Sequence, residues 1–150
     1  MPTITINKKA LADYQILEKF EAGIILTGAE VKAVKKGQIN LKGSYAAVDH
    51  KNQIALINAH ISAYRPAAGS QTNYEPTKDR KLLLKKKEID YLRGKSQEHG
   101  LTILPISVYT KGGLVKLELG LARGKKQFDK RASIKKREID REIRRKLKKF

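Results

Sequence analysis

The chain contains no cysteine and no tryptophan among its 150 residues, and its 15 acidic residues face 33 lysines and arginines. Without cysteine, disulfide frameworks and thiolate metal sites are excluded, and the composition is compatible with a reducing cytoplasm. Without tryptophan, any stacking on nucleic-acid bases falls to six tyrosines and three phenylalanines. The shortage of acid leaves a formal net charge of +18, which is typical of proteins that bind a polyanion.

Signals for membranes and for catalysis are also missing. No apolar run approaches the roughly 20 residues that a spanning helix needs, and the start, MPTITINKK, has no apolar signal-peptide segment. Residues 94–96 read Gly-Lys-Ser, but Ile89 stands where a phosphate-binding loop requires glycine. His50, His60 and His99 are too far apart in sequence to suggest a metal-type pair. We therefore expect no enzyme activity, no metal, no cofactor and no membrane partner.

The positive charge is concentrated at the end of the chain. Residues 121–150 hold 14 basic and four acidic residues, whereas the first 120 hold 19 basic and 11 acidic ones. A fifth of the chain therefore carries over half of the net charge. We divide the chain into a folded RNA-binding domain, residues 1–123, and a basic tail, residues 124–150.

Alternating apolar residues predict strands along much of the first part. From Leu114 to Ala122, apolar residues alternate with polar or small ones, a period of two that buries one face. Gly112–Gly113 joins this strand to a partner at 101–111, and Pro105 within that partner predicts an edge strand or a bulge. A second hairpin is expected between 44–49 and 53–64, with further strands at 3–6, 14–20 and 23–26.

Capping signals predict three short helices. Asn7 can cap the first, and Thr27 and Glu30 stand at capping-box spacing before a helix that Gly37 ends. The third is expected within 85–100. The fold class is therefore mainly β, a six-stranded antiparallel barrel of the oligonucleotide-binding type with about three short helices, the common solution for a small basic β domain.

Several motifs together resemble one family. In order they are FEAG (20–23), GAEVKAVKKG (28–37), YEPTKDRKLLL (74–84), GLTILP (100–105), YTKGGLVKLELGLARGKK (109–126) and FDKR (128–131). They resemble the SsrA-binding protein (small protein B) family of bacterial trans-translation from about Thr3 into the tail. The resemblance implies an oligonucleotide-binding-type barrel, a partner in the tRNA-like domain of transfer-messenger RNA, and entry into ribosomes stalled without a stop codon. It also implies a cytoplasmic monomer that meets the tRNA-delivering elongation factor through the RNA.

The resemblance and the basic residues together indicate an RNA-contacting set. By resemblance it includes Glu21, Leu83 and the position of Lys85, which is often Asn in the family. Glu21 could accept a hydrogen bond from a base amino group or a 2′-hydroxyl, or it could orient a nearby lysine, and at least two of the three leucines 82–84 are expected in the core. The full expected set for transfer-messenger RNA is Glu21, Lys32, Lys35, Arg80, Lys81, Leu83, Lys85, Arg123, Lys125 and Lys126.

The tail carries a thin helical stripe. Ile139, Ile143, Leu147 and Phe150 are spaced four, four and three apart, too few to hold an isolated helix in water. We expect the tail to be disordered when free and helical when bound. The resemblance implies that it occupies the empty mRNA channel of the small subunit near the decoding centre, against ribosomal RNA. The residues expected there are Phe128, Asp129, Lys130, Arg131, Lys135, Lys136, Arg137, Arg141, Arg144 and Arg145.

Some alternatives stay open from sequence. Phe128 could stack on a base while Lys130 and Arg131 bind phosphates, whereas Asp129 either caps the following helix or contacts RNA. Lys32 and Lys35 could supply only a diffuse positive field. The whole chain could instead be a structural ribosomal protein or assembly factor with a nonspecific basic extension. A nuclease would need clustered carboxylates for a metal, and the carboxylates here are scattered.

Overall fold

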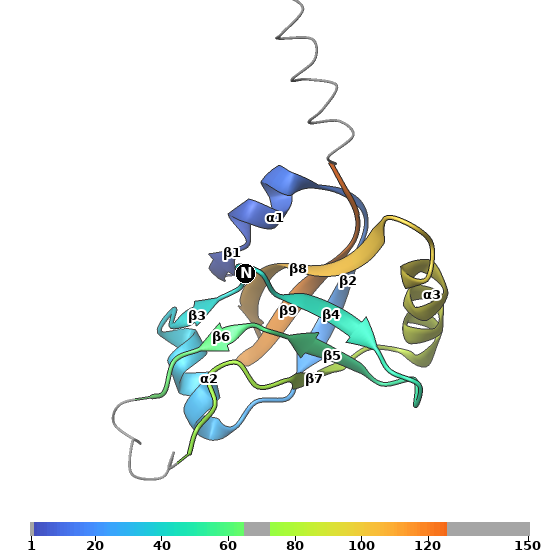
Figure 1. Ribbon diagram of the computed structural model, residues 1–150. Coiled ribbons are helices and arrows are strands. Elements are labelled where there is room, and N and C mark those ends of the chain that lie inside the picture. The colour runs from blue at the N-terminus through green and yellow to red at the C-terminus, as the bar shows by residue number, and fades with distance from the viewer. Residues whose placement is uncertain (1, 65–72, 126–150) are drawn as a thin grey trace, which may run out of the picture.

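The computed structural model describes residues 2–64 and 73–125, which form nine strands and three helices (Figure 1). Strands hold 46% of the described residues and helices 22%, so the mainly β prediction is confirmed. In chain order the elements are β1 (Thr3–Ile6), α1 (Lys8–Asp13), β2 (Tyr14–Ile24), α2 (Gly28–Lys35), β3 (Ile39–Asn40), β4 (Tyr45–Val48), β5 (Ile54–Ile57), β6 (His60–Ile61), β7 (Arg80–Leu83), α3 (Lys86–Ser96), β8 (Leu101–Lys111) and β9 (Leu114–Gly124).

Six of the strands close into a barrel. The order β8-β4-β5-β7-β2-β9 is completed by pairing between β9 and β8, and every pairing is antiparallel. β1 joins the outer edge of β8, and β3 pairs with β6 in a separate two-stranded ladder. The predicted six-stranded antiparallel barrel is therefore confirmed.

The β8–β9 hairpin is the longest feature of the barrel. Its turn residues Gly112 and Gly113 have φ of 58° and 79°, which glycine adopts without steric cost and which suits the twist of a two-residue hairpin. The register shifts between Pro105 and Ser107, so the bulge predicted from Pro105 is confirmed. Leu117, which points inward from β9, is fully buried.

Two of the expected strand boundaries are wrong. The segment expected to break near 21–23 is one continuous strand, β2, because it pairs with β9 from Tyr14 to Gly23 and that ladder holds it extended. The segment 53–64 is not one strand: Asn58 has a φ of 65°, and the chain turns there to send β6 to β3. Asparagine tolerates this left-handed conformation better than most residues.

The three predicted helices are present, and two of them begin at the predicted caps. Asn7 Oδ1 accepts a hydrogen bond from the Ala10 N–H at 3.3 Å. The Thr27 hydroxyl accepts from the Glu30 N–H at 3.2 Å, while Glu30 Oε1 accepts from the Thr27 N–H at 3.0 Å, which completes the capping box. Within the described ranges, no helix has the length and apolar content needed to cross a membrane.

Candidate nucleic-acid interface

The outward side chains of β2 and β7 form one surface, which places two of the predicted RNA contacts side by side. In the antiparallel register Gly23 on β2 lies opposite Leu83 on β7, and Glu21 lies two residues before Gly23. Side chains two apart along a strand share a face. Glu21 and Leu83 therefore belong to the same outward surface, which we call the β2–β7 face.

Leu83 projects from this face while its neighbours pack inward. Its side chain is 52% exposed, whereas Leu82 is 2% exposed and Leu84 packs against the main core. The prediction that at least two of these three leucines belong to the core is confirmed. Gly23 makes room for the projecting leucine, because a Cβ there would lie 3.3 Å from Leu83 Cβ.

Two predicted lysines extend this face. Lys81 is exposed on β7, and the Ile25 N–H donates to its carbonyl oxygen at 2.9 Å. Lys85 is exposed at the N-cap of α3, where its N–H donates to Glu88 Oε1 at 3.1 Å. Lys81 and Lys85 stand two residues before and two residues after Leu83, so the exposed leucine is flanked in the chain by exposed cationic residues.

Glu21 is held by side chains that sequence reasoning did not single out. The Tyr109 hydroxyl donates to Glu21 Oε2 at 2.7 Å, and Lys111 Nζ lies 3.3 Å from Oε1. The Tyr109 hydrogen bond, with help from Lys111, lowers the pKa of Glu21 despite its partial desolvation. Glu21 is therefore paired with a lysine, which is one of the two arrangements that the sequence left open for it. Its side chain remains 41% exposed and can accept further hydrogen bonds.

A hollow of about 480 Å³ adjoins this carboxylate. β8 contributes Ser107 and Tyr109 to it, and β9 contributes Glu118. The signal that could have found Tyr109 is the hairpin register, which places it opposite Lys116 on the outer face of β9. The residues lining the hollow are Thr3, Lys19, Phe20, Glu21, Ser107, Tyr109 and Glu118.

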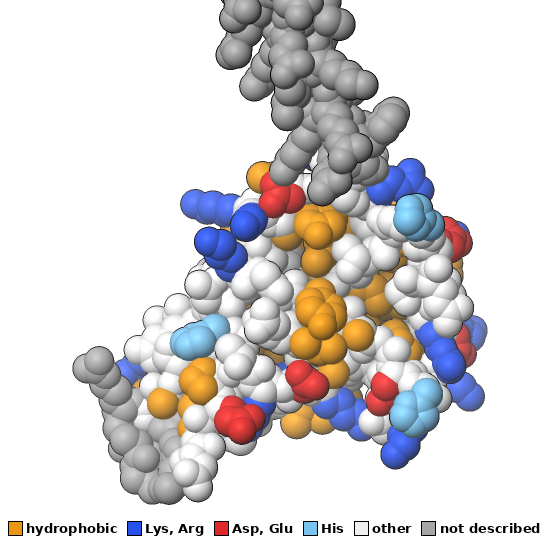
Figure 2. Space-filling model, viewed as in Figure 1, with side chains coloured by type: hydrophobic (Ala, Val, Ile, Leu, Met, Phe, Trp, Pro, Cys, Tyr) orange, Lys and Arg blue, Asp and Glu red, His pale blue; other side chains and the backbone are white. Residues whose placement is uncertain are grey.

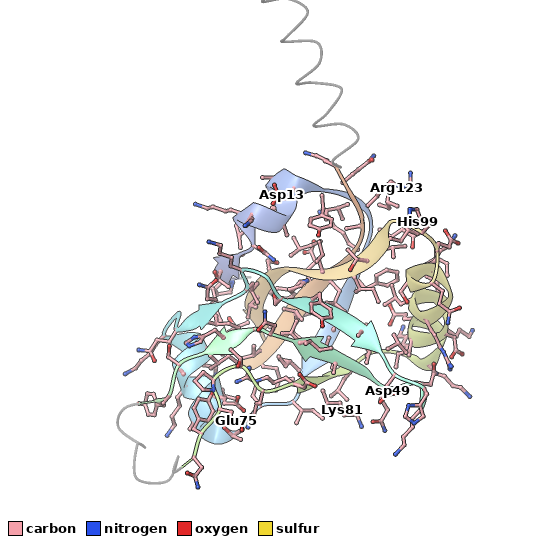
Figure 3. All side chains as sticks on the ribbon, in the orientation of Figure 1. Asp13, Asp49, Glu75, Lys81, His99 and Arg123 are labelled. Atoms are coloured by element: carbon pink, nitrogen blue, oxygen red, sulfur yellow. The ribbon has the colours of Figure 1, made fainter. Side chains whose placement is uncertain are left out.

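Four other predicted residues are exposed but lie apart from the β2–β7 face. Lys32 and Lys35 are on α2, which lies on the opposite side of the barrel from α3 (Figure 1). Lys32 Nζ lies 5.7 Å from the centre of the Tyr64 ring. Arg123 and Lys125 are at the far end of β9, and Figure 3 shows Arg123 and Lys81 at opposite ends of the domain. The RNA contacts expected of these four residues stay predictions.

Arg80 corrects the prediction most clearly. It was expected on the RNA surface, yet its side chain is 1% exposed. Its Nε and Nη2 donate to Glu30 Oε2 at 3.0 and 2.8 Å, and its Nη1 donates to the Ala59 carbonyl at 2.7 Å. Tyr74 completes the cluster, since Arg80 Nη2 lies 3.0 Å from its hydroxyl. Arg80 therefore joins α2, the β5–β6 connection and β7 from inside, and it has no surface to offer to RNA.

Glu30 has the cap role that the sequence predicted and a second role that it did not. Burial acts to raise the pKa of Glu30, but the hydrogen bond from the Thr27 N–H and the Arg80 guanidinium outweigh burial and lower it. The carboxylate thus stays charged inside the domain. Tyr74 also donates to the Ile61 carbonyl at 2.8 Å, which attaches the segment before β7 to β6.

The rest of the predicted set lies outside the described residues. This holds for Lys126 and for every residue expected at the decoding centre: Phe128, Asp129, Lys130, Arg131, Lys135, Lys136, Arg137, Arg141, Arg144 and Arg145. In residues 2–64 and 73–125, no group of three or more His, Cys, Asp or Glu side chains is arranged to hold a metal ion.

The surface of the described domain is mixed in charge. Figure 2 shows one face, on which Lys and Arg side chains gather at the edges and hydrophobic side chains run down the middle. The small antiparallel barrel is of the oligonucleotide-binding type, a class of fold whose strands and loops bind nucleic acids or oligosaccharides.

The family is shown by comparison. The chain matches the model of the SmpB protein family over residues 4–149, and it belongs to that family. It is 52% identical over 142 residues to the SsrA-binding protein of Rubrobacter xylanophilus, covering 95% of this chain and 93% of that one. It is 54% identical over 137 residues to the SsrA-binding protein of Syntrophobacter fumaroxidans, covering 91% and 83%.

A solved structure is similar along most of its length. It is described as "tmRNA-SmpB: a journey to the center of the bacterial ribosome", and it is 42% identical with a TM-score of 0.68. The match covers 84% of this chain and 86% of that chain.

Proposed function

We propose that this chain is an RNA-binding adaptor for ribosome rescue. The barrel binds the tRNA-like domain of transfer-messenger RNA and delivers it to stalled ribosomes for trans-translation. Family membership over residues 4–149 supports this role. So does the likeness to a structure whose description names transfer-messenger RNA, SmpB and the bacterial ribosome. An adaptor of this kind works in the cytoplasm, and it meets the tRNA-delivering elongation factor through the RNA.

The observation that carries the proposal is the β2–β7 face. Leu83 is 52% exposed on a paired strand, where it offers apolar contact area beside a carboxylate and lysines. Structured RNA offers 2′-hydroxyls, phosphates and unstacked bases to such a surface. The leucine packs against a ribose or base, the lysines bind phosphates, and Glu21 accepts a hydrogen bond.

The mechanism we assign is positioning, and this chain makes or breaks no bond. The barrel stands in for the anticodon arm that the tRNA-like domain lacks. The tail, residues 124–150, enters the mRNA channel only when it is empty, and Phe128, Lys130 and Arg131 contact ribosomal RNA near the decoding centre. Fourteen basic residues in the last 30 favour such an RNA-lined channel, because each phosphate contact releases condensed counterions.

The test is a gel-shift competition at physiological salt. Labelled tRNA-like-domain RNA is bound to the chain and challenged with itself, with tRNA and with unstructured RNA. The proposal predicts that only the first competes efficiently. Equal competition by all three RNAs contradicts it and favours the alternative of a ribosomal protein with a basic extension.

The same assay tests the face with a matched pair of leucines. Leu83→Ala removes the exposed side chain on β7, whereas Leu11→Ala removes one that is 40% exposed on α1. We expect Leu83→Ala to weaken binding about five- to thirtyfold, because the complex loses the burial of one half-exposed leucine side chain. Leu11→Ala should leave binding unchanged. Equal effects would show that the β2–β7 face is not the contact.

A further inference from the structure

Two carboxylates lie side by side on this strongly basic protein. Glu21 on β2 and Glu118 on β9 are directly opposite in the register. Like charges at such positions are unfavourable in a sheet. Each carboxylate has a lysine partner: Lys111 Nζ lies 3.3 Å from Glu21, and Lys19 Nζ lies 3.5 Å from Glu118. Proteins keep such locally unfavourable arrangements mainly at functional sites. The two lysine-paired carboxylates therefore indicate a surface that uses hydrogen-bond acceptors.

Tyr109 fixes the orientation of one of these carboxylates. It is 8% exposed on β8, and its hydroxyl reaches across β9 to Glu21 Oε2 at 2.7 Å. Among glutamates of this strand, Glu18 receives a similar bond from Tyr91 at 2.6 Å, but on the other face of β2. Glu18 shares its parity with Phe20 and the fully buried Ala22, whereas Glu21 has the opposite parity.

We propose that Tyr109 is a positioning residue for RNA recognition: with Lys111 it holds Glu21 as a fixed acceptor for a hydrogen-bond donor of the RNA. The donor is a ribose 2′-hydroxyl or a base amino group, and the site rests on the proposed function. This adds β8 to the recognition surface, although none of the RNA contacts expected from sequence lies on that strand.

The arrangement selects by charge and by geometry. A fixed carboxylate repels a phosphate oxygen and accepts hydrogen bonds from O–H or N–H groups. Glu21 therefore excludes the RNA phosphate backbone from its own position, while the surrounding lysines attract that backbone to neighbouring positions. Because Tyr109 is held in the barrel wall, Glu21 loses little side-chain freedom when RNA binds. Lys111, Lys116, Glu118 and Tyr109 are the ionisable groups that set the pKa of Glu21 or face it across the sheet.

The test compares two tyrosine-to-phenylalanine variants of the full chain. Tyr109→Phe deletes only the hydroxyl that binds Glu21, and Tyr91→Phe deletes the equivalent hydroxyl at Glu18. We expect Tyr109→Phe to raise the Kd for tRNA-like-domain RNA about two- to tenfold, the range for one hydrogen bond. Tyr91→Phe should leave the Kd unchanged, and both variants should keep the wild-type thermal midpoint.

A double-mutant cycle separates positioning from a structural role. In the Glu21→Gln background, Tyr109→Phe should add no further loss, because its effect acts through the carboxylate. The same loss in both backgrounds, or no loss from Tyr109→Phe alone, overturns the inference. If Tyr109→Phe lowers the thermal midpoint, the exposed Lys111→Met variant replaces it in the cycle, with the same two outcomes.

The pH profile gives a second readout. Loss of the Tyr109 hydroxyl should raise the pKa of Glu21, so the fall of RNA affinity on acidification should begin at higher pH in Tyr109→Phe than in the wild type. If RNA affinity begins to fall at the same pH in both proteins, the inference is contradicted.

Modified RNAs identify the donor. Single 2′-deoxy substitutions, and base analogues that lack the exocyclic amino group, are tested against the wild type and Tyr109→Phe. A substitution that weakens only wild-type binding identifies the group, and no such substitution of either kind overturns the acceptor role. If the wild type does not prefer the tRNA-like RNA at all, the proposed function fails; if it does and Tyr109→Phe binds equally well, only this inference fails.

Discussion

Arg80 shows how much the environment of one residue decides its role. In sequence it is one of 33 basic residues, next to Lys81, which is exposed. In the structure it is buried against Glu30, 50 residues earlier in the chain, and no spacing rule links the two. A buried guanidinium is tolerated because its Nε, Nη1 and Nη2 all donate to oxygen atoms of the protein.

At this scale we predict that Arg80→Ala destabilises the domain by about 3–5 kcal/mol, because it leaves the Glu30 carboxylate buried without its partner. Urea unfolding measures this loss directly. Arg80→Ala in the Glu30→Gln background should cost less than Arg80→Ala alone, since no buried charge is then orphaned. A loss below about 1 kcal/mol, the level of an exposed ion pair, would contradict this account.

At the scale of elements, Asn7 docks α1 onto the barrel. It is 6% exposed, and its Nδ2 donates to the Pro105 carbonyl at 2.9 Å, beside the bulge of β8. The helix then covers a small second core of Ala10, Leu104 and Ala122. One side chain thus caps the helix and fixes its place on β8.

Asn7→Asp tests this docking role, because it keeps the capping oxygen but removes the donor to Pro105 and places a charge in a buried site. We expect a loss of about 1–3 kcal/mol in thermal or urea unfolding. The control is Asn40→Asp, where the exposed Oδ1 accepts from the Lys42 N–H at 2.9 Å and no buried donor is lost. Similar stability of the two variants would show that the Pro105 contact contributes nothing.

Elements with strong local signals could be predicted, and those set by distant pairing could not. The Gly112–Gly113 turn, the capping box at Thr27 and the bulge at Pro105 follow from local chemistry. The length of β2 depends on its ladder with β9, and β6 separates from β5 because it pairs with β3. No local signal in the sequence encodes either pairing. The hairpin register could have placed Tyr109 on the outer face, but its contact with Glu21 depends on the distant β2–β9 pairing.

At the scale of the whole molecule, we propose that the chain consists of two modules, the barrel and the tail. All six strands of the closed barrel lie before residue 125, and Glu21 and Leu83 lie on that barrel. The tail, residues 124–150, holds 13 of the 33 basic residues of the chain. We propose that the barrel selects one RNA and that the tail contacts another.

The most direct test is tagging of nascent chains on ribosomes stalled without a stop codon, using a chain that lacks residues 132–150. Its Kd for tRNA-like-domain RNA is measured in parallel. The account predicts that the truncated chain binds this RNA as the full chain does and supports no tagging, because only the tail reads the mRNA channel. Equal loss of RNA binding and tagging, or tagging at the full level, would contradict the division into two modules.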